Sequence, residues 1–200
     1  MKLFYSPSSP YARKTRIVAI EKGLHTRIES IATSPFDDTP ASRALSAANP
    51  LRKIPTLVLD DGTAIYDSHV ICEYFDQIGD GPALIPRDAD ERIRHLTIAA
   101  AADGILDAAF SVVMELRRPA ENRSEFWIER WMANIGRAMN ALSLDLTDQF
   151  QLQHITAICA IDYLDFRLAD RFSPNSDIRE WRSKHVSRHS VAETMPSEVL

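Results

Sequence analysis

The segment SPSSPYARK places Ser9 at the amino end of a helical pattern, directly after a predicted strand. Unpaired backbone N–H groups and the helix dipole at such an end favour a negative charge, so a thiolate or carboxylate would be stabilised there. Serine is also a preferred N-cap residue, and from the local pattern alone capping is the more common role. Ser8 is open to the same two interpretations.

A second polar segment, NPLRKIPTLVLDDGTAIYDS, contains Pro55 before a predicted strand and the pair Asp67 and Ser68 at the start of the next helix. An X–Pro bond is cis in only about 5% of cases in folded proteins, so the local sequence gives little support for a cis bond at Pro55. The Asp-Ser pair has two interpretations. It is an N-cap, or it is a carboxylate and hydroxyl that bind the ammonium and carboxylate of a ligand.

The composition argues against several classes of ligand. With 23 Lys+Arg against 28 Asp+Glu, the 200-residue chain has a net charge of −5, which argues against a nucleic-acid-binding protein. Its 6 glycines form neither a dinucleotide-binding motif nor a P-loop. His185 and His189 have metal-ligand spacing, but the sequence offers no third ligand to complete a site, so we expect no metal.

Several features indicate a reducing compartment. Cys72 and Cys159 lie in separate apolar stretches and suggest neither a disulfide framework nor a CxxC pair. The start MKLFYSPSSP lacks the pattern of a secretory signal, and no apolar run reaches the roughly 18 residues that a membrane span requires. We therefore expect a cytoplasmic protein that does not act at a membrane.

These polar residues must be positioned by a small sheet with helices. β-rich runs predict strands at residues 2–5, 27–31, 56–59 and 64–66, the last two joined by a DGT turn. Helices are predicted from Pro10 to a stop at Gly23, and over 40–47 and 68–78. The order βαβαββα predicts a mixed sheet, with the first two strands parallel and the last two antiparallel.

The second part of the chain is predicted to be all-helical. The segment GDGPALIPRD marks a linker, which we place at residues 80–87 between a first domain at 1–79 and a helical domain at 88–200. Amphipathic or alanine-rich patterns predict helices over 89–116, 124–146, 154–172 and 178–189.

The combination of Ser-Pro-Tyr at the first helix, Lys-Ile-Pro before the third strand and Asp-Ser after the fourth resembles the glutathione S-transferase superfamily, in its bacterial, serine-type, cytosolic form. PALIPRD, AAADGILDAAFSVVMELRRP and ITAICAIDYLDFR resemble the helical domain of that superfamily, so the resemblance covers nearly the whole chain. It implies a thioredoxin-like α+β domain followed by an all-α domain.

The resemblance also implies roles for individual residues. Ser9 would donate a hydrogen bond to the sulfur of glutathione and hold it as the thiolate, for attack on a hydrophobic electrophile. Pro55 would be cis and would present the backbone of Ile54 to the cysteinyl unit. Asp67 and Ser68 would bind the γ-glutamyl end. Lys53 would bind the glycyl carboxylate, and the further candidates for the site are Tyr5, Ser8, Tyr11 and Arg52.

Glutathione is thus the expected co-substrate, and a homodimer is the expected assembly, by resemblance. A serine cannot form a mixed disulfide, which disfavours thiol transfer but leaves conjugation in detoxification, glutathione-dependent isomerisation and peroxide reduction open. The alternative is a non-catalytic adaptor with the same fold, as in the stringent starvation proteins. One departure from the superfamily pattern is Gln151 to His154, where the usual Ser/Thr-capped box is missing.

Overall fold

The computed structural model describes residues 1–143, 147 and 149–198. The described chain forms two compact units, one of residues 1–85 with the segment from Arg188 onward, the other of Pro86–Ser187. The sequence placed all residues after 87 in the helical domain. The structure instead groups the segment from Arg188 with the first unit, because helix α8 packs against α1.

The first unit is built on a four-stranded sheet with the order β2-β1-β3-β4. Its strands are β1 (Lys2–Tyr5), β2 (Glu29–Ala32), β3 (Thr56–Val58) and β4 (Ala64–Ile65). β1 and β2 are parallel, whereas β1–β3 and β3–β4 are antiparallel, which confirms the predicted mixed sheet. β2 starts two residues later than predicted because His25–Arg27 form a 3₁₀ turn, η1.

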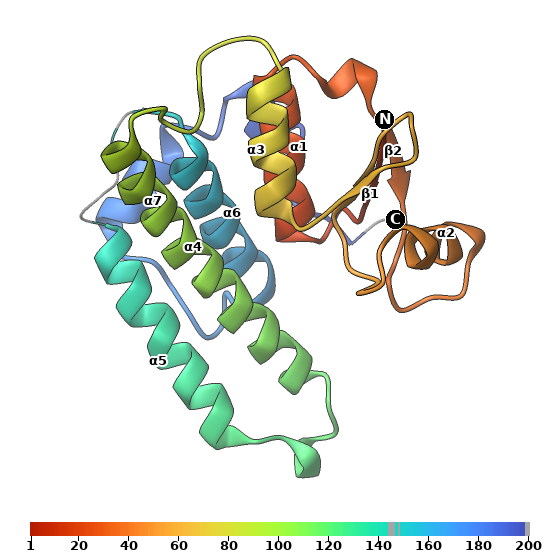
Figure 1. The fold of residues 1–200 in the computed structure, drawn as a ribbon. Coiled ribbons are helices and arrows are strands. Elements are labelled where there is room, and N and C mark those ends of the chain that lie inside the picture. Colours follow the sequence, from red (N-terminus) through yellow and green to blue (C-terminus); the bar gives the residue numbers. More distant parts are fainter. Residues whose placement is uncertain (144–146, 148, 199–200) are drawn as a thin grey trace. The chain divides into compact units, whose positions relative to one another are not determined.

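Two helices of this unit, α1 and α3, lie side by side (Figure 1). Ile17 and Val18 of α1 and Phe75 of α3 are fully buried, as are Leu3 and Leu57, which face each other across the β1–β3 ladder. The helices of the unit are α1 (Pro10–Glu21), α2 (Pro40–Ala48), α3 (Ser68–Ile78) and α8 (His189–Ala192). The apolar faces of α1 and α3 form this core. The core therefore fixes the two helices whose amino ends carry predicted site residues.

A buried ion pair joins the carboxyl-terminal parts of α1 and α3. The Lys22 ammonium lies 3.2 Å from a carboxylate oxygen of Asp76 and donates to the Pro82 carbonyl at 3.0 Å. The same Asp76 oxygen accepts the backbone N–H of Leu84 at 2.8 Å. A Cβ at Gly79 would lie 2.5 Å from the Cβ of Lys22, so the chain leaves α3 at a position where only glycine fits.

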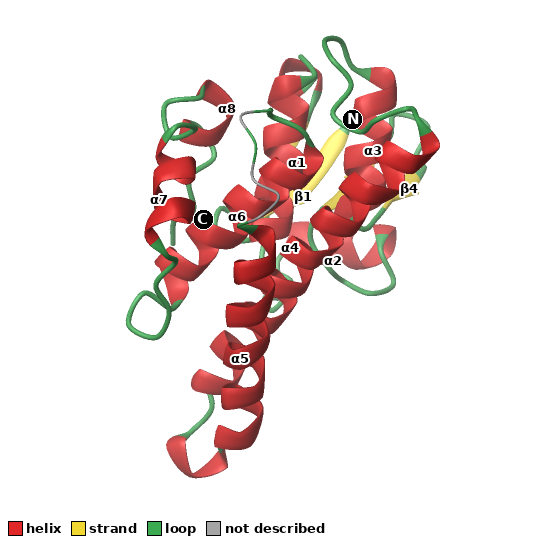
Figure 2. Cartoon of the chain, turned by 90° about the vertical axis from the view of Figure 1, so that its left-hand side faces the viewer, coloured by secondary structure: helices red, strands yellow, loops and turns green. Residues whose placement is uncertain are grey.

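The second unit is helical throughout its described elements (Figure 2). Its elements are α4 (Ala89–Leu116), the 3₁₀ turn η2 (Ala120–Asn122), α5 (Glu125–Leu142), α6 (Leu152–Arg167) and α7 (Ser176–Ser183). α4 packs against both α5 and α6, and α6 is buried from Leu152 to Leu164. Among the described residues α4 is the one helix long and apolar enough to cross a membrane, but its buried, alanine-rich face is used in this packing.

Several helix ends differ from the predictions. The predicted extension of α5 over residues 144–146 lies outside the described residues. α6 begins at Leu152 and ends at Arg167, earlier at both ends than predicted, and the predicted helix 178–189 is replaced by α7 and α8. The usual Ser/Thr-capped box before α6 is absent, and a different pair replaces it. Gln151 and His154 form a reciprocal capping box, in which the Gln151 N–H donates to Nδ1 of His154 at 3.3 Å.

Candidate functional site

The strand register gathers the predicted site residues at one end of the sheet. Phe4 pairs with Thr56, and Leu57 pairs with Ile65, so the carboxyl ends of β1 and β4 and the amino end of β3 share one edge. The Ser6–Ser9 turn follows β1, Ile54–Pro55 precedes β3, and Asp67–Ser68 follows β4. All three polar segments singled out from the sequence therefore meet at this edge.

Ser9 is the N-cap of α1. Its hydroxyl oxygen accepts the backbone N–H of Ala12 at 3.2 Å, and its own N–H donates to the Ser6 carbonyl at 3.1 Å, which closes a turn with Pro7 at the second position. A hydroxyl that accepts from the helix keeps its own proton for donation to another group. Capping and donation to a ligand are therefore compatible at Ser9. The Ser8 hydroxyl lies 3.4 Å from that of Ser6.

The two tyrosines of this region lie on either side of the turn. Tyr5 ends β1, and the guanidinium of Arg16 lies 4.9 Å from the centre of its ring. Burial lowers the pKa of Arg16, while the neighbouring Tyr5 opposes that shift. Tyr11 is half-buried on the first turn of α1. The arginine over its ring favours a packing role for Tyr5.

The segment before β3 is held by a buried asparagine that the sequence reasoning missed. The Ile54–Pro55 bond is cis, as the resemblance predicted. Asn49 is 1% exposed, and its side-chain amide donates to the Lys53 carbonyl at 3.2 Å and to the Thr56 hydroxyl at 2.9 Å. The signal in the sequence was an asparagine between a helix and a proline, a common turn position.

The two basic candidates differ in their surroundings. Arg52 has a φ of 51°, the left-handed region, and its guanidinium donates to the backbone carbonyl of Asp37. This bond ties Arg52 to the loop before α2. The side chain of Lys53 is exposed on the same segment. Arg52 therefore stabilises the loop before α2, whereas the side chain of Lys53 faces solvent.

Asp67 and Ser68 lie where β4 turns into α3. Asp67 is the N-cap, and its Oδ1 accepts the His69 N–H at 3.0 Å. The carboxylate is exposed, whereas Ser68 is buried at 4% exposure. The Tyr66–Asp67 bond is also cis. Because the cap uses one carboxylate oxygen, Asp67 retains acceptor capacity for a ligand ammonium. Among residues 1–143, 147 and 149–198 no three potential metal ligands gather.

The sequence of the chain is similar to those of known proteins. Residues 8–78 match the family described as glutathione S-transferase, N-terminal domain. The uncharacterized GST-like protein YibF of Escherichia coli K12 is 38% identical over 173 residues, 84% of this chain and 83% of that protein.

A solved structure and a relative matched over a shorter length are also similar to this chain. A glutathione transferase family member from Pseudomonas fluorescens Pf-5, crystallised with bound glutathione, has a TM-score of 0.90 and 38% identity over 98% of both chains. A stringent starvation protein A homolog of Coxiella burnetii is 36% identical over 87 residues, 43% of this chain and 38% of that protein. Since the similarity to YibF spans most of both proteins, the chain belongs to the glutathione S-transferase superfamily.

Proposed function

We propose that the protein binds glutathione at the edge of the sheet and activates its thiol with the Ser9 hydroxyl. The observation that carries this proposal is the Ser9 geometry. The hydroxyl accepts from Ala12 at the amino end of a 12-residue helix, which leaves its proton available to another acceptor. A sulfur placed there would meet a hydroxyl donor and the positive end of α1.

The energy required is within reach of these two effects. Lowering a thiol pKa by about two units needs roughly 2.7 kcal/mol of preferential stabilisation of the thiolate. A hydrogen bond to a charged group contributes about 1.5–3 kcal/mol, and a helix terminus about 0.3–1 kcal/mol. Together they account for a thiolate at neutral pH without a cationic side chain.

The other segments at this edge supply contacts for the rest of the tripeptide. Glutathione has one ammonium and two carboxylates. Asp67 would accept from the ammonium, Ser68 would donate to the γ-glutamyl carboxylate, and Lys53 would pair with the glycyl carboxylate. The cis bond before Pro55 leaves the Ile54 backbone to pair with the cysteinyl unit as an added strand. The similar P. fluorescens protein holds glutathione in its crystal structure.

The reaction we propose is conjugation. The thiolate attacks an electrophilic carbon of an apolar substrate, a carbon–sulfur bond forms, and the leaving group departs with the electron pair of its bond. The protein orients the reactants and stabilises the thiolate, and it forms no covalent bond itself. Isomerisation or peroxide reduction would use the same thiolate. We expect a homodimer in the cytoplasm.

A second candidate is a non-catalytic adaptor. The observation in its favour is the 36% identity to a stringent starvation protein A homolog over 87 residues. An adaptor needs the fold but not a thiolate. The two candidates therefore differ in one measurable property, which is whether bound glutathione is ionised at neutral pH.

The test compares Ser9→Ala with Ser8→Ala and Tyr5→Phe. We expect Ser9→Ala to lower the rate of conjugation with an activated chloronitrobenzene about 30–100-fold at pH 6.5, because a rise of about two units in the thiol pKa removes that fraction of thiolate. Glutathione affinity, measured by calorimetry, should change less than about threefold.

The control variants should keep most of the activity. If Ser9→Ala is fully active and Ser8→Ala or Tyr5→Phe is not, the activating hydroxyl belongs to the other residue. If the unmodified protein binds no glutathione, the adaptor function is favoured.

A further inference from the structure

The chain returns to its first unit after the helical unit and runs along α1 in the opposite direction. Arg188 lies at the carboxyl end of α1, where its Nε and Nη2 donate to the two carboxylate oxygens of Glu21 at 2.8 and 2.6 Å. The Ser190 hydroxyl donates to the same carboxylate. Burial alone would raise the pKa of Glu21, but the bonds from Arg188 and Ser190 lower it. This end of the segment is firmly anchored.

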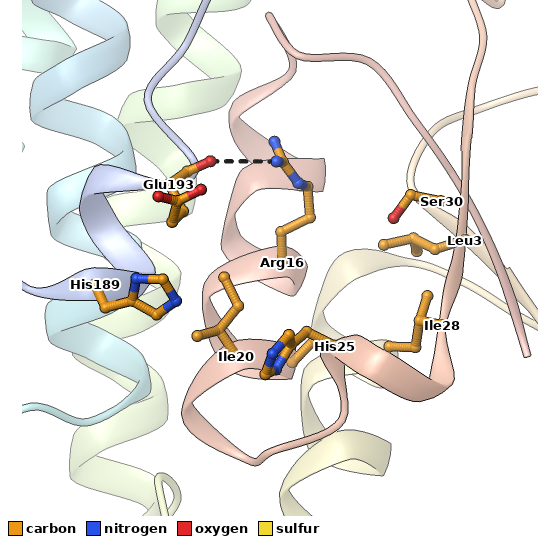
Figure 3. Close-up of a pocket in the computed structure, with 9 residues that line it drawn as sticks. Leu3, Arg16, Ile20, His25, Ile28, Ser30, His189 and Glu193 are labelled. Atoms are coloured by element: carbon orange, nitrogen blue, oxygen red, sulfur yellow. Dashed lines mark hydrogen bonds between the residues drawn. The ribbon is translucent and has the colours of Figure 1, made fainter.

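The middle of the segment is held by two arginines of α1. Arg13 is 2% exposed, and its guanidinium donates to the Val191 carbonyl and to the Thr194 hydroxyl, both at 3.4 Å. Arg16, one turn further along, donates to the Glu193 carbonyl at 3.4 Å (Figure 3).

Packing in this middle region is incomplete. Figure 3 shows Ile20 of α1 opposite His189, beside a hollow of about 200 Å³ that reaches to Leu3 and Ile28. Val191 and Thr194 are nonetheless fully buried, so the segment is held by packing as well as by hydrogen bonds.

The last described backbone contact of the segment reaches the Ser6–Ser9 turn. The Ser197 N–H donates to the Pro7 carbonyl at 3.4 Å. That carbonyl belongs to the Pro7–Ser8 peptide, the central peptide of the turn closed by Ser9 and Ser6. Rotation of this peptide separates type I from type II turns.

The backbone dihedral angles show which of the two turn types is present. Type II needs a positive φ at the third position of the turn, and among the described non-glycine residues only Arg52 has one. Ser8 therefore excludes type II, and the bond from Ser197 is made to the peptide in its present orientation. The segment ends on the peptide from which Ser8 and Ser9 extend.

We propose that residues 188–198, the C-terminal strap, position the Ser6–Ser9 turn for thiol activation, with Arg13 and the Ser197 N–H as the positioning groups. This rests on the proposed function of Ser9. The strap bonds to α1 and, through Ser197, to the Ser6–Ser9 turn. Asn49 holds the segment before Pro55, and Asp67 caps its own helix. Loss of the strap should therefore reduce ionisation of the bound thiol and leave glutathione affinity nearly intact.

The sharpest test uses one backbone donor. Ser197→Pro removes the N–H, and Ser197→Ala retains it, so the pair differs in the bond to Pro7. A chain ending at Met195 and one ending at Glu198 make a second matched pair, since the longer chain keeps Ser197. Neither pair removes Arg188, Thr194 or α8, so the fold should persist, as checked by circular dichroism.

For Ser197→Pro and for the chain ending at Met195 we expect the pKa of bound glutathione to rise by about 0.5 units and kcat at pH 6.5 to fall about threefold. KM for glutathione should stay within about twofold, and both controls should match the full-length protein. Equal thiol pKa and kcat within each pair would overturn the proposal. So would a rise in KM that accounts for the whole loss of kcat/KM.

A second readout separates the strap from the function of Ser9. Hydrogen exchange of the Ser9 amide, which bonds to Ser6, should be faster in Ser197→Pro than in Ser197→Ala. If full-length protein shows no thiolate, the proposed function fails. Faster exchange in Ser197→Pro then still supports the strap as a positioning element of the turn, and equal exchange refutes it.

Discussion

Asn49 offers the most informative test of how the segment before β3 is held. Its side chain accepts the Leu51 N–H at 2.9 Å and donates to the Lys53 carbonyl at 3.2 Å and the Thr56 hydroxyl at 2.9 Å. Asn49→Ala removes all three bonds at a position that is 1% exposed. We therefore expect it to loosen the loop that presents Ile54 and Pro55.

The expected loss of stability depends on the groups that Asn49→Ala leaves without a hydrogen bond from this side chain. Three bonds at about 0.5–1.5 kcal/mol each set an upper range of about 1.5–4.5 kcal/mol. The Lys53 carbonyl keeps a bond from the Thr56 hydroxyl at 2.7 Å, and Leu51 is exposed enough for water to reach its N–H. We expect a loss of about 2 kcal/mol in the free energy of unfolding, and about a tenfold weaker affinity for glutathione.

The assay is urea unfolding followed by far-ultraviolet circular dichroism, because Trp127, Trp131 and Trp181 all lie in the helical unit and do not report on the first unit. Asn140→Ala, at an exposed position of α5, is the control and should change stability by less than about 0.5 kcal/mol. A change below about 0.5 kcal/mol for Asn49→Ala, with unaltered glutathione affinity, would refute the reasoning.

Two further predictions concern stability. Gly79→Ala should lower the free energy of unfolding by more than about 2 kcal/mol, since the new Cβ would lie 2.5 Å from Lys22 Cβ and 2.8 Å from its carbonyl oxygen. Gly136→Ala, with nothing within 4 Å, should instead be neutral or stabilising by up to about 1 kcal/mol; equal effects of the two substitutions in urea unfolding would contradict the steric argument. His154 is 1% exposed, and burial, with contributions from His185 and His95, lowers its pKa to about 4. Because its unfolded pKa is about 6.5, stability should fall as pH drops from about 6.5 towards 4, by about 2–3 kcal/mol at pH 4.5, and His154→Gln should flatten that decline; an unchanged pH profile in the variant would exclude His154 as its source.

Local signals explain what could be predicted from the sequence. Ser9 with Pro10, and Asp67 with Ser68, are cap patterns whose helices begin where the sequence indicated. The parallel pairing of the first two strands followed from the right-handed crossover, and the antiparallel pairing of the last two followed from the DGT turn. The edge at which the polar segments meet was then a consequence of topology.

Long-range and unusual contacts explain the rest. The C-terminal strap depends on pairs such as Arg188 with Glu21, which no local pattern reveals, so residues 188–198 were assigned to the helical domain. The cap of α6 uses a glutamine and a histidine in place of the usual hydroxyl and carboxylate. The local sequence indicates only an ordinary turn residue at Asn49. Its role depends on the bond to Thr56, which forms only when the loop between them is folded.

The most direct test of thiol activation by Ser9 is an ultraviolet difference titration of glutathione bound to the full-length protein and to Ser9→Ala, following thiolate absorbance against pH. We predict a saturable thiolate signal with a pKa about two units below that of free glutathione, and a return towards the free value in Ser9→Ala. No thiolate signal at millimolar glutathione, or the same low pKa in both proteins, would contradict activation by Ser9.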